Sequence, residues 1–195
     1  MEIQILRSPS EEDWIRCLFL ARVTQGKENM ISPSIEWRRK LLNAEHSPMR
    51  TLMVTVVMWQ IPYFASVHFV RHKIGVEHYV KSQRSNPDRG AERQDALVNH
   101  VMDMNVQALI NMSRKRLCQR ADPVTRNIME NIKSEIEKMD PLLGSFLVPD
   151  CVYRQGCHEF QSCGYPANKY DIEQTIEVVE KYKLQEEDTE KDEES

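Results

Sequence analysis

The sequence predicts an α+β protein, because some segments carry apolar residues at helical spacing and others alternate them as strands do. Helical spacing is clearest after residue 122, where Ile128, Ile132 and Ile136 recur every four residues. The β-branched run 50–60 has two apolar faces, which predicts a strand covered on both sides. The 195 residues, 41% of them hydrophobic and 29% charged, suffice for a domain with its own core.

The N-terminal third is expected to hold one short strand, at residues 3–6, and two helices. Ser10 precedes three acidic residues and is a typical N-cap for the first helix, which Gly26 should stop. Ser34 is placed to cap the second helix, which should run to residue 44. A loop over residues 45–48 is expected to follow.

Pro62 suits the first turn of a helix over residues 63–72, with Phe64, Val67 and Val70 facing inward. The basic segment that follows would then begin at a helix C-terminus, where positive charge is favoured. Five further elements are predicted: a strand over 97–102, helices from 104 and 122, a helical turn over 141–147 and a last amphipathic helix over 171–182.

We expect three parts along the chain: one domain over residues 1–150, a Cys-rich segment with a helix packed on it over 151–183, and a disordered acidic tail over 184–195. No membrane span is expected, because Gln60 and Pro62 end the longest apolar run. The first residues lack the layout of a signal peptide, and the five cysteines are odd in number. A cytoplasmic protein with reduced thiols is therefore expected.

The segment 70–84 concentrates basic side chains in a chain whose net charge is -4. Its basic or titratable residues are Arg71, His72, Lys73, His78, Lys81 and Arg84, with Ser82 and Gln83 as neutral hydrogen-bonding groups. Such a cluster is typical of a site for a phosphorylated or anionic ligand, and the alternative is a solvated basic face. The net acidic charge argues against general binding to a nucleic-acid polymer.

The order of these residues resembles the signature of the flavin-dependent thymidylate synthases. That signature is Arg-His-Arg, a spacer of seven or eight residues, then Ser with Arg two further on; this chain has 71–73 and 82–84 at those places. A second block resembles the family's Arg-x-Cys-x-x-Ala motif at Arg116, Cys118, Ala121 and Arg126. Residues 20–24 and 46–48, together with two asparagines before Arg116, also match, so the resemblance covers about 20–126 in collinear order.

The resemblance implies a flavin-dependent thymidylate synthase-like fold, with a central antiparallel or mixed sheet flanked by long helices. It implies a homotetramer whose active sites are shared between subunits. It also implies reductive methylation of dUMP to dTMP with bound FAD, methylenetetrahydrofolate as the folate carbon donor and NADPH as reductant. In such an enzyme the cofactor carries the chemistry, and the protein orients and polarises.

By matched position, the resemblance assigns roles to individual residues. The residues that it implies for cofactor binding are Thr24, His46, Ser47, Arg71, His72, Lys73, Asn105 and Asn111. The residues for substrate binding are His68, Ser82, Gln83, Arg84 and Arg116, with Arg116 and Ser82 as the catalytic pair. Arg84 would bind the nucleotide phosphate, and Arg116 would stabilise the negative charge that develops on the uracil carbonyls.

Helical spacing gives an independent reason to group some of these residues. Asn105 and Arg116 are eleven residues apart, about three turns, and therefore share one face of a helix. Polar groups at 105 and 111, on successive turns of a half-apolar helix, indicate a ligand wall. The alternative is a solvated helix face.

Several positions depart from the family pattern. Lys73 replaces an arginine, Arg50 an acid, Val80-Lys81 an Asn-Glu pair, His68 a glutamine, and 122–125 a Gln-x-Glu-Ile run. Two of these changes, at Arg50 and Lys81, exchange an acid for a base near the expected nucleotide site. Two alternatives therefore stay open: a related flavin- and folate-dependent modification of a pyrimidine nucleotide, or a non-catalytic nucleotide- or metal-binding protein on the same fold.

Cys151, Cys157 and Cys163, with His158 beside them, form a separate feature. Three thiolates with a histidine, or with Cys118 as a fourth sulfur, are ligands that zinc prefers. Their spacing is longer than in common zinc modules, so ordinary reduced thiols and a redox role are the alternatives. His100, next to a predicted strand, is expected to be a hydrogen-bonded structural histidine.

Overall fold

Four antiparallel strands in the order β1-β2-β4-β3 form the centre of the protein in a computed structural model, which describes residues 1–81 and 95–165. Ser82, Gln83 and Arg84, the predicted helix 171–182 and the acidic tail lie outside the described residues. The elements are β1 (Glu2–Arg7), α1 (Glu11–Val23), α2 (Ile35–Ala44), the 3-10 helix η1 (Ser47–Thr51), β2 (Met53–Pro62), α3 (Tyr63–Val70), β3 (Val76–Val80), β4 (Leu97–Asn105), α4 (Val106–Arg116), α5 (Pro123–Met139), α6 (Pro141–Ser145) and α7 (Asp150–Tyr153). The predicted α+β class is confirmed.

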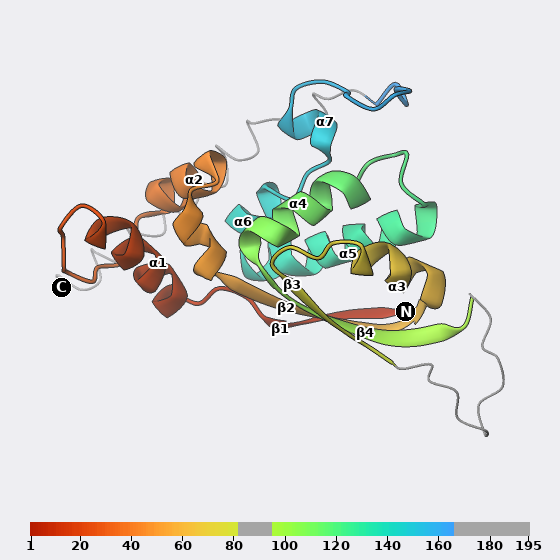
Figure 1. The fold of residues 1–195 in the computed structure, drawn as a ribbon, viewed down its shortest axis with the longest axis horizontal. Helices are drawn as coiled ribbons and strands as arrows, with labels where there is room; N and C mark the ends of the chain where they lie inside the picture. Colours follow the sequence, from red (N-terminus) through yellow and green to blue (C-terminus); the bar gives the residue numbers. More distant parts are fainter. Residues whose placement is uncertain (82–94, 166–195) are drawn as a thin grey trace, which may run out of the picture.

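Helices α3, α4 and α5 cover one face of the sheet, and α1 and α2 extend from one end of it (Figure 1). The covered face carries Val54, Val56 and Met58 of β2 and Met102 and Met104 of β4, all fully buried. Ile128, Ile132 and Ile136 of α5 close the core from above, as their spacing predicted. No helix among the described residues is long and apolar enough to cross a bilayer.

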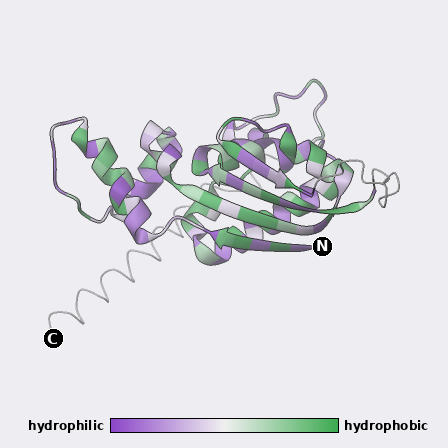
Figure 2. Ribbon diagram, turned by 60° about the horizontal axis from the view of Figure 1, so that its bottom comes forward, coloured by the Kyte–Doolittle hydropathy of each residue, from purple (hydrophilic) through white to green (hydrophobic). Residues whose placement is uncertain are grey.

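The opposite face of the sheet is only partly covered, so the prediction of a central strand buried on both sides is wrong. Figure 2 turns the sheet side of the molecule toward the viewer, with the strands in front of the helices. On β2, Met53 and Thr55 are half-buried there and Trp59 is 38% exposed. Apolar side chains on a strand therefore did not guarantee a second covering layer.

The helix caps follow the sequence closely. The side chain of Ser10 accepts from the backbone N–H of Asp13 at 3.2 Å, and the carboxylate of Asp13 accepts from the N–H of Ser10 at 3.2 Å. This reciprocal capping box starts α1. Ser34 and Asp122 likewise cap α2 and α5, as predicted. Local hydrogen bonding alone decides these boundaries.

Helix α3 differs from its prediction in its ends and in its buried face. Pro62 is the N-cap rather than the first helical residue, and the helix ends at Val70, two residues earlier than expected. Its buried residues are Ala65, Ser66 and Phe69, whereas Val67 is 37% exposed. The small residues at 65 and 66 let the helix approach β4 closely.

Two strands lead into helices without a loop. β2 ends at Pro62 and α3 begins at Tyr63, while β4 ends at Asn105 and α4 begins at Val106. The second strand is longer than the predicted 97–102, and the helix starts two residues later than expected. Strand β3, at 76–80, was not predicted, because these residues were treated as the spacer of the basic segment; the loop after α2 also holds the short helix η1.

Candidate functional site

The basic turn 71–75 joins α3 to β3 and lies against the start of α4. Gly75 ends the turn with φ of +73°, and a Cβ there would lie 2.4 Å from Nδ2 of Asn105. The N–H of Asn105 donates to the carbonyl of Gly75 at 3.0 Å. Both the backbone conformation and the lack of space therefore require glycine at this position.

Arg116, the last residue of α4, reaches this turn with its guanidinium. Its Nε–H donates to Nε2 of His72 at 3.0 Å, and its Nη2 donates to the carbonyl of His68 at 2.6 Å. Because Nε2 of His72 accepts, the proton of that neutral ring must be on Nδ1. Two of the five N–H groups of Arg116 are thus used to fix its plane, and the other three have no hydrogen-bond partner within residues 1–81 and 95–165.

His68 is held in turn by the N-terminus of α5. Its Nδ1 lies 2.7 Å from the hydroxyl of Thr125, and that hydroxyl donates to the carboxylate of Asp122 at 3.1 Å. Since the hydroxyl has a single proton, Nδ1 of His68 is the donor and Nε2 carries the free lone pair. Partial burial raises the pKa of Asp122, but hydrogen bonds from the backbone and side chain of Thr125 outweigh it and leave that pKa lowered.

The electrostatics of this cluster favour an anion. Burial, and then the neighbouring Arg116 and His78, lower the pKa of His72 to about 4, so its ring is neutral at pH 7. Burial and the nearby charge of Arg71 lower the pKa of Arg116. Within the described residues, neither Arg71 nor Arg116 has a carboxylate within 4.0 Å. Two cations without a counter-charge are what an anionic ligand requires.

Asn105 and Asn111 lie in different surroundings. The side chain of Asn105 packs against Gly75 of the basic turn and caps α4 by accepting from the N–H of Ala108 at 2.9 Å. Asn111 instead faces a second cluster, where it accepts from Arg114 at 3.2 Å and from Gln107 at 3.4 Å. Only Asn105 therefore lies beside the basic turn, because Asn111 is on another face of α4 from Arg116.

The N-terminal residues expected to bind the cofactor are also separate from the basic turn. Thr24 is the C-cap of α1, and its hydroxyl donates to the carbonyl of Ala21 at 2.9 Å. His46 precedes η1 and Ser47 opens it, and both are exposed. Helices α1 and α2 lie at the opposite end of the molecule from α3 (Figure 1). The structure thus brings together His68, Arg71, His72 and Arg116, with Lys73 exposed on the same turn.

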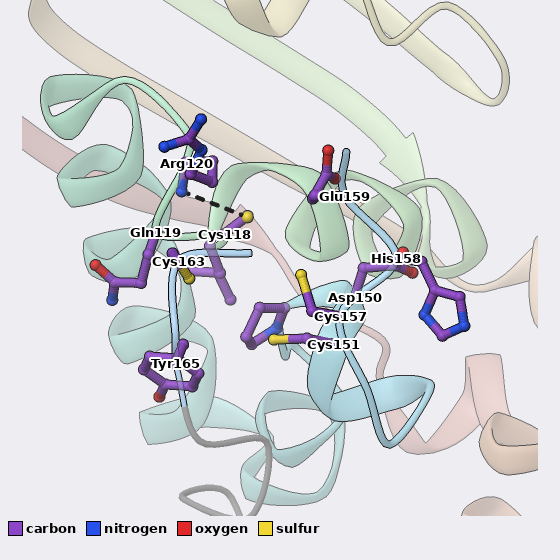
Figure 3. A pocket seen from close by; sticks show the side chains of 12 residues that line it. Cys118, Gln119, Arg120, Asp150, Cys151, Cys157, His158, Glu159, Cys163 and Tyr165 are labelled. Carbon is purple, nitrogen blue, oxygen red and sulfur yellow. Dashed lines mark hydrogen bonds between the residues drawn. The ribbon is translucent and has the colours of Figure 1, made fainter. Parts of the chain in front are cut away.

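Four of the five cysteines gather beyond the end of α4, where they line a small pocket (Figure 3). Cys118, Cys151, Cys157 and Cys163 all contribute to its wall, next to His158. Burial, and then the neighbouring thiol of Cys118, raise the pKa of Cys151. Within residues 1–81 and 95–165, no group of three His, Cys, Asp or Glu side chains is arranged to hold a metal ion. The predicted zinc site at Cys151, Cys157 and Cys163 is therefore not supported.

Near the basic turn, sequence reasoning included His78 of β3 in the basic cluster but missed its contact with His100, and it missed Ser66 of α3 altogether. His78 pairs with Met102, and Val80 with His100, so the two histidines are diagonal neighbours across the strands. The sequence signal for this strand is the alternation at 76–80: Val76, His78 and Val80 share one face, and Glu77 and Tyr79 share the exposed face. His100 is fully buried and hydrogen-bonded, as expected.

Comparison with solved structures first defines the class of fold. A crystal structure of the UMP/dUMP methylase PolB from Streptomyces cacaoi, bound with 5-Br dUMP, resembles this chain with a TM-score of 0.57 and 11% sequence identity. The similarity covers 74% of this chain and 94% of the methylase. At that identity it establishes a shared fold, an open antiparallel sheet with helices.

Comparison of sequences adds a similarity over part of the chain. The flavin-dependent thymidylate synthase of Clostridium tetani is 34% identical over 72 residues, which are 37% of this chain and 29% of that enzyme. No family model matches the chain. The two similarities agree with each other and support a family like that of the flavin-dependent thymidylate synthases.

Proposed function

We propose that this protein is a flavin-dependent thymidylate synthase-like enzyme that converts dUMP to dTMP, acting in the cytoplasm. The observation that carries the proposal is the contact of Arg116 with His72 and His68 beside the charge of Arg71. This group brings the 71–73 block and the motif that begins at Arg116 into one basic, half-buried site. Among the described residues, its arginines have no carboxylate partner. A planar guanidinium whose three other N–H groups have no partner in the described part of the chain suits a phosphate or a pair of uracil carbonyls.

In this proposal Arg116 lies against the uracil ring and polarises it. As C5 becomes nucleophilic, negative charge develops on the ring carbonyls, and a fixed cation beside them stabilises it. Arg116 cannot lose its proton at neutral pH and therefore keeps this role throughout a turnover. His68 contributes a free Nε2 lone pair nearby, and Ser82, Gln83 and Arg84 are proposed to hold the nucleotide and its phosphate.

The residues present fit a flavin dinucleotide, whose two phosphates need cationic donors. Arg71 and Lys73 are exposed on the turn, and His72 offers a neutral Nδ1–H. When bound, the FAD would supply the hydride and mediate transfer of the carbon from methylenetetrahydrofolate, with NADPH as its reductant. The chain's own groups would bind the phosphates and orient the ring.

We further propose that the enzyme is a homotetramer with shared sites. Thr24, His46 and Ser47, which the family pattern assigns to the flavin, belong to the end of the molecule that carries α1 and α2, away from α3. A second copy is one way to bring them to the turn. The division into a domain over 1–150 and a following segment over 151–183 remains part of the same proposal.

A second reaction is favoured by one specific observation. The fold is shared with the UMP/dUMP methylase PolB, and positions 50, 73 and 80–81 depart from the synthase pattern. UMP is therefore the alternative substrate. Parallel assays with UMP and dUMP decide between the two.

Release of tritium from C5-labelled dUMP, with methylenetetrahydrofolate, FAD and NADPH, tests the reaction directly. The purified protein should be yellow, with a flavin absorption that bleaches on addition of NADPH. Tritium release that depends on folate and reductant supports the proposal. Normal FAD uptake without release from either nucleotide would leave a non-catalytic binding protein.

The matched pair of variants is Arg116→Ala and Arg120→Ala. Arg120 is exposed, lies four residues further on and donates to Gln161 rather than to the basic turn. Arg116→Ala should abolish release while the assembly and the bound flavin persist, and Arg120→Ala should release tritium as the wild type does. Loss of assembly in Arg116→Ala would make Arg116 a structural residue.

A further inference from the structure

Behind the basic turn, four residues form a continuous line of hydrogen bonds from α3 to the turn itself. The hydroxyl of Ser66 lies 3.0 Å from Nδ1 of His100, and Nε2 of His100 lies 3.0 Å from Nδ1 of His78. Nε2 of His78 lies 2.7 Å from the backbone carbonyl of His72. Ser66 and His100 are buried, at 1% and 0% exposed.

The carbonyl at the end of the line determines where every proton lies. A carbonyl oxygen only accepts, so Nε2 of His78 must carry a hydrogen. In neutral His78 the other nitrogen, Nδ1, then accepts from Nε2–H of His100. Nδ1 of His100 is left to accept from the hydroxyl of Ser66. The neutral line therefore has a single order of donors, directed from Ser66 toward the turn.

The carbonyl at the end of this line belongs to His72, and the ring of His72 orients Arg116. His72 thus receives a hydrogen bond on its backbone from His78 and one on its ring from Arg116. The neutral ring of His72 carries its proton on Nδ1, whereas those of His78 and His100 carry theirs on Nε2. Burial, and then the proximity of the titratable His78, lower the pKa of His100 to about 4, consistent with a neutral ring in the line.

We propose that His78 and His100 are positioning residues, which hold the carbonyl of His72 and thereby orient the guanidinium of Arg116 toward an anionic nucleotide. The identity of the ligand rests on the proposed function, but the order of the hydrogen bonds does not. Nothing in the line touches the ligand directly, so its effect is on the placement of Arg116.

Substitutions of His78 by its two amide analogues separate this role from simple core packing. The amide nitrogen of glutamine can replace Nε2 and keep the hydrogen bond to His72. The amide oxygen of asparagine can replace Nδ1 and accept from His100, but this shorter side chain leaves the carbonyl of His72 without its donor. Both side chains are polar and smaller than imidazole, so each is the control for the other.

The probe is dUMP, titrated into the full-length protein by calorimetry, together with the NMR signal of the Arg116 Nε–H. His78→Gln should bind dUMP within about threefold of the wild type and keep a slowly exchanging Nε–H. His78→Asn should bind about tenfold more weakly, with a fast-exchanging Nε–H, because the anchor of His72 is lost. Equal affinity and equal exchange in the two variants would overturn the proposal.

The ring protons of the wild-type protein give a second measurement that needs neither ligand nor substitution. Long-range nitrogen–proton spectra at pH 8 should show His72 protonated on Nδ1 and both His78 and His100 on Nε2. Any other pattern overturns the proposal, even if neither variant folds. If the ring protons are as expected and the Arg116 Nε–H is protected, but dUMP does not bind, then the nucleotide is rejected and the positioning role is retained.

Discussion

Two arginines of α4, only two residues apart, have opposite environments. Arg114 forms an ion pair with Glu45 and its guanidinium carbon lies 3.5 Å from the centre of the Tyr153 ring. Arg116 donates to an imidazole and a carbonyl, with no carboxylate partner among the described residues. The contacts of Arg114 with Glu45 and Tyr153 link α4 to the C-cap of α2 and to α7. The charge of Arg116 has no such partner in the described part of the chain, which is why we propose a ligand for Arg116 and a structural role for Arg114.

The largest expected effect is on catalysis at Arg116. Arg116→Ala should lower tritium release by about 100- to 1000-fold, the usual loss when one preorganised charge donor to a transition state is removed. Arg114→Ala should retain a release rate within about threefold of the wild type when assayed well below its melting temperature. Equal losses in the two variants would erase the functional difference between these arginines.

The second-largest expected effect is on the free energy of unfolding, at the turn that carries His72. Gly75→Ala is expected to lower the free energy of unfolding by about 2–3 kcal/mol, because a positive φ and a clash with Asn105 act together. Gly26→Ala is the control, since Gly26 has the same φ of +73° but nothing within 4 Å of its Cβ position. Urea unfolding measures both, and a loss no greater than that of Gly26→Ala would show that the turn adapts.

The paired arginine should matter for stability. Arg114→Ala is expected to cost about 1–2 kcal/mol in the free energy of unfolding, because it removes a half-buried ion pair and a cation–π contact. Glu45 would be left partly buried without its cation. Thermal unfolding of Arg114→Ala beside Arg154→Ala, whose guanidinium is half-exposed, checks this. An unchanged melting temperature would mean that Tyr153 and Gln107 compensate.

The smallest effect at neutral pH comes from the buried histidines. His72 and His100 have folded-state pKa values of about 4, below the ordinary value of 6.5, so the unfolded chain takes up their protons first. The free energy of unfolding should therefore fall as pH drops from about 6.5 toward 4. The carboxylates with lowered pKa, including Glu45 and Asp122, act mainly below that window.

Unfolding at several pH values, in the wild type and in His100→Gln, tests this dependence. The variant should show a shallower fall between pH 6.5 and 4, whatever its stability at pH 7. His158→Gln changes an exposed histidine and should follow the wild-type slope. A wild-type stability that rises as the pH falls through this window would contradict the burial of neutral rings.

The sequence predicted best those features that depend on near neighbours. The caps at Ser10, Ser34 and Asp122 require only groups within three residues, and all three were confirmed. Strand β3 was missed because its identity depends on pairing with β4, about twenty residues away. The buried face of α3 was wrong because apolar side chains were preferred over Ala65 and Ser66, which the close approach to β4 selects.

The same distinction applies to the candidate site. Arg71, His72 and Arg116 were expected in one site from the order of motifs, and the structure brings them together, although their roles in catalysis stay predictions. Asn111 was misplaced because helical spacing was counted through Asn105, a cap. The line through His78 and His100 depends on strand register, and no motif encodes that register.

The two junctions at which a strand continues directly into a helix have a mechanical consequence. Arg116 lies at the far end of an eleven-residue α4 that leaves β4 without a loop, so the helix acts as a lever arm of about 16 Å. A tilt of about four degrees at Asn105 would shift the guanidinium by roughly 1 Å, enough to spoil a near-attack geometry. The position of the Arg116 guanidinium therefore depends on how rigidly the sheet holds the junction between β4 and α4.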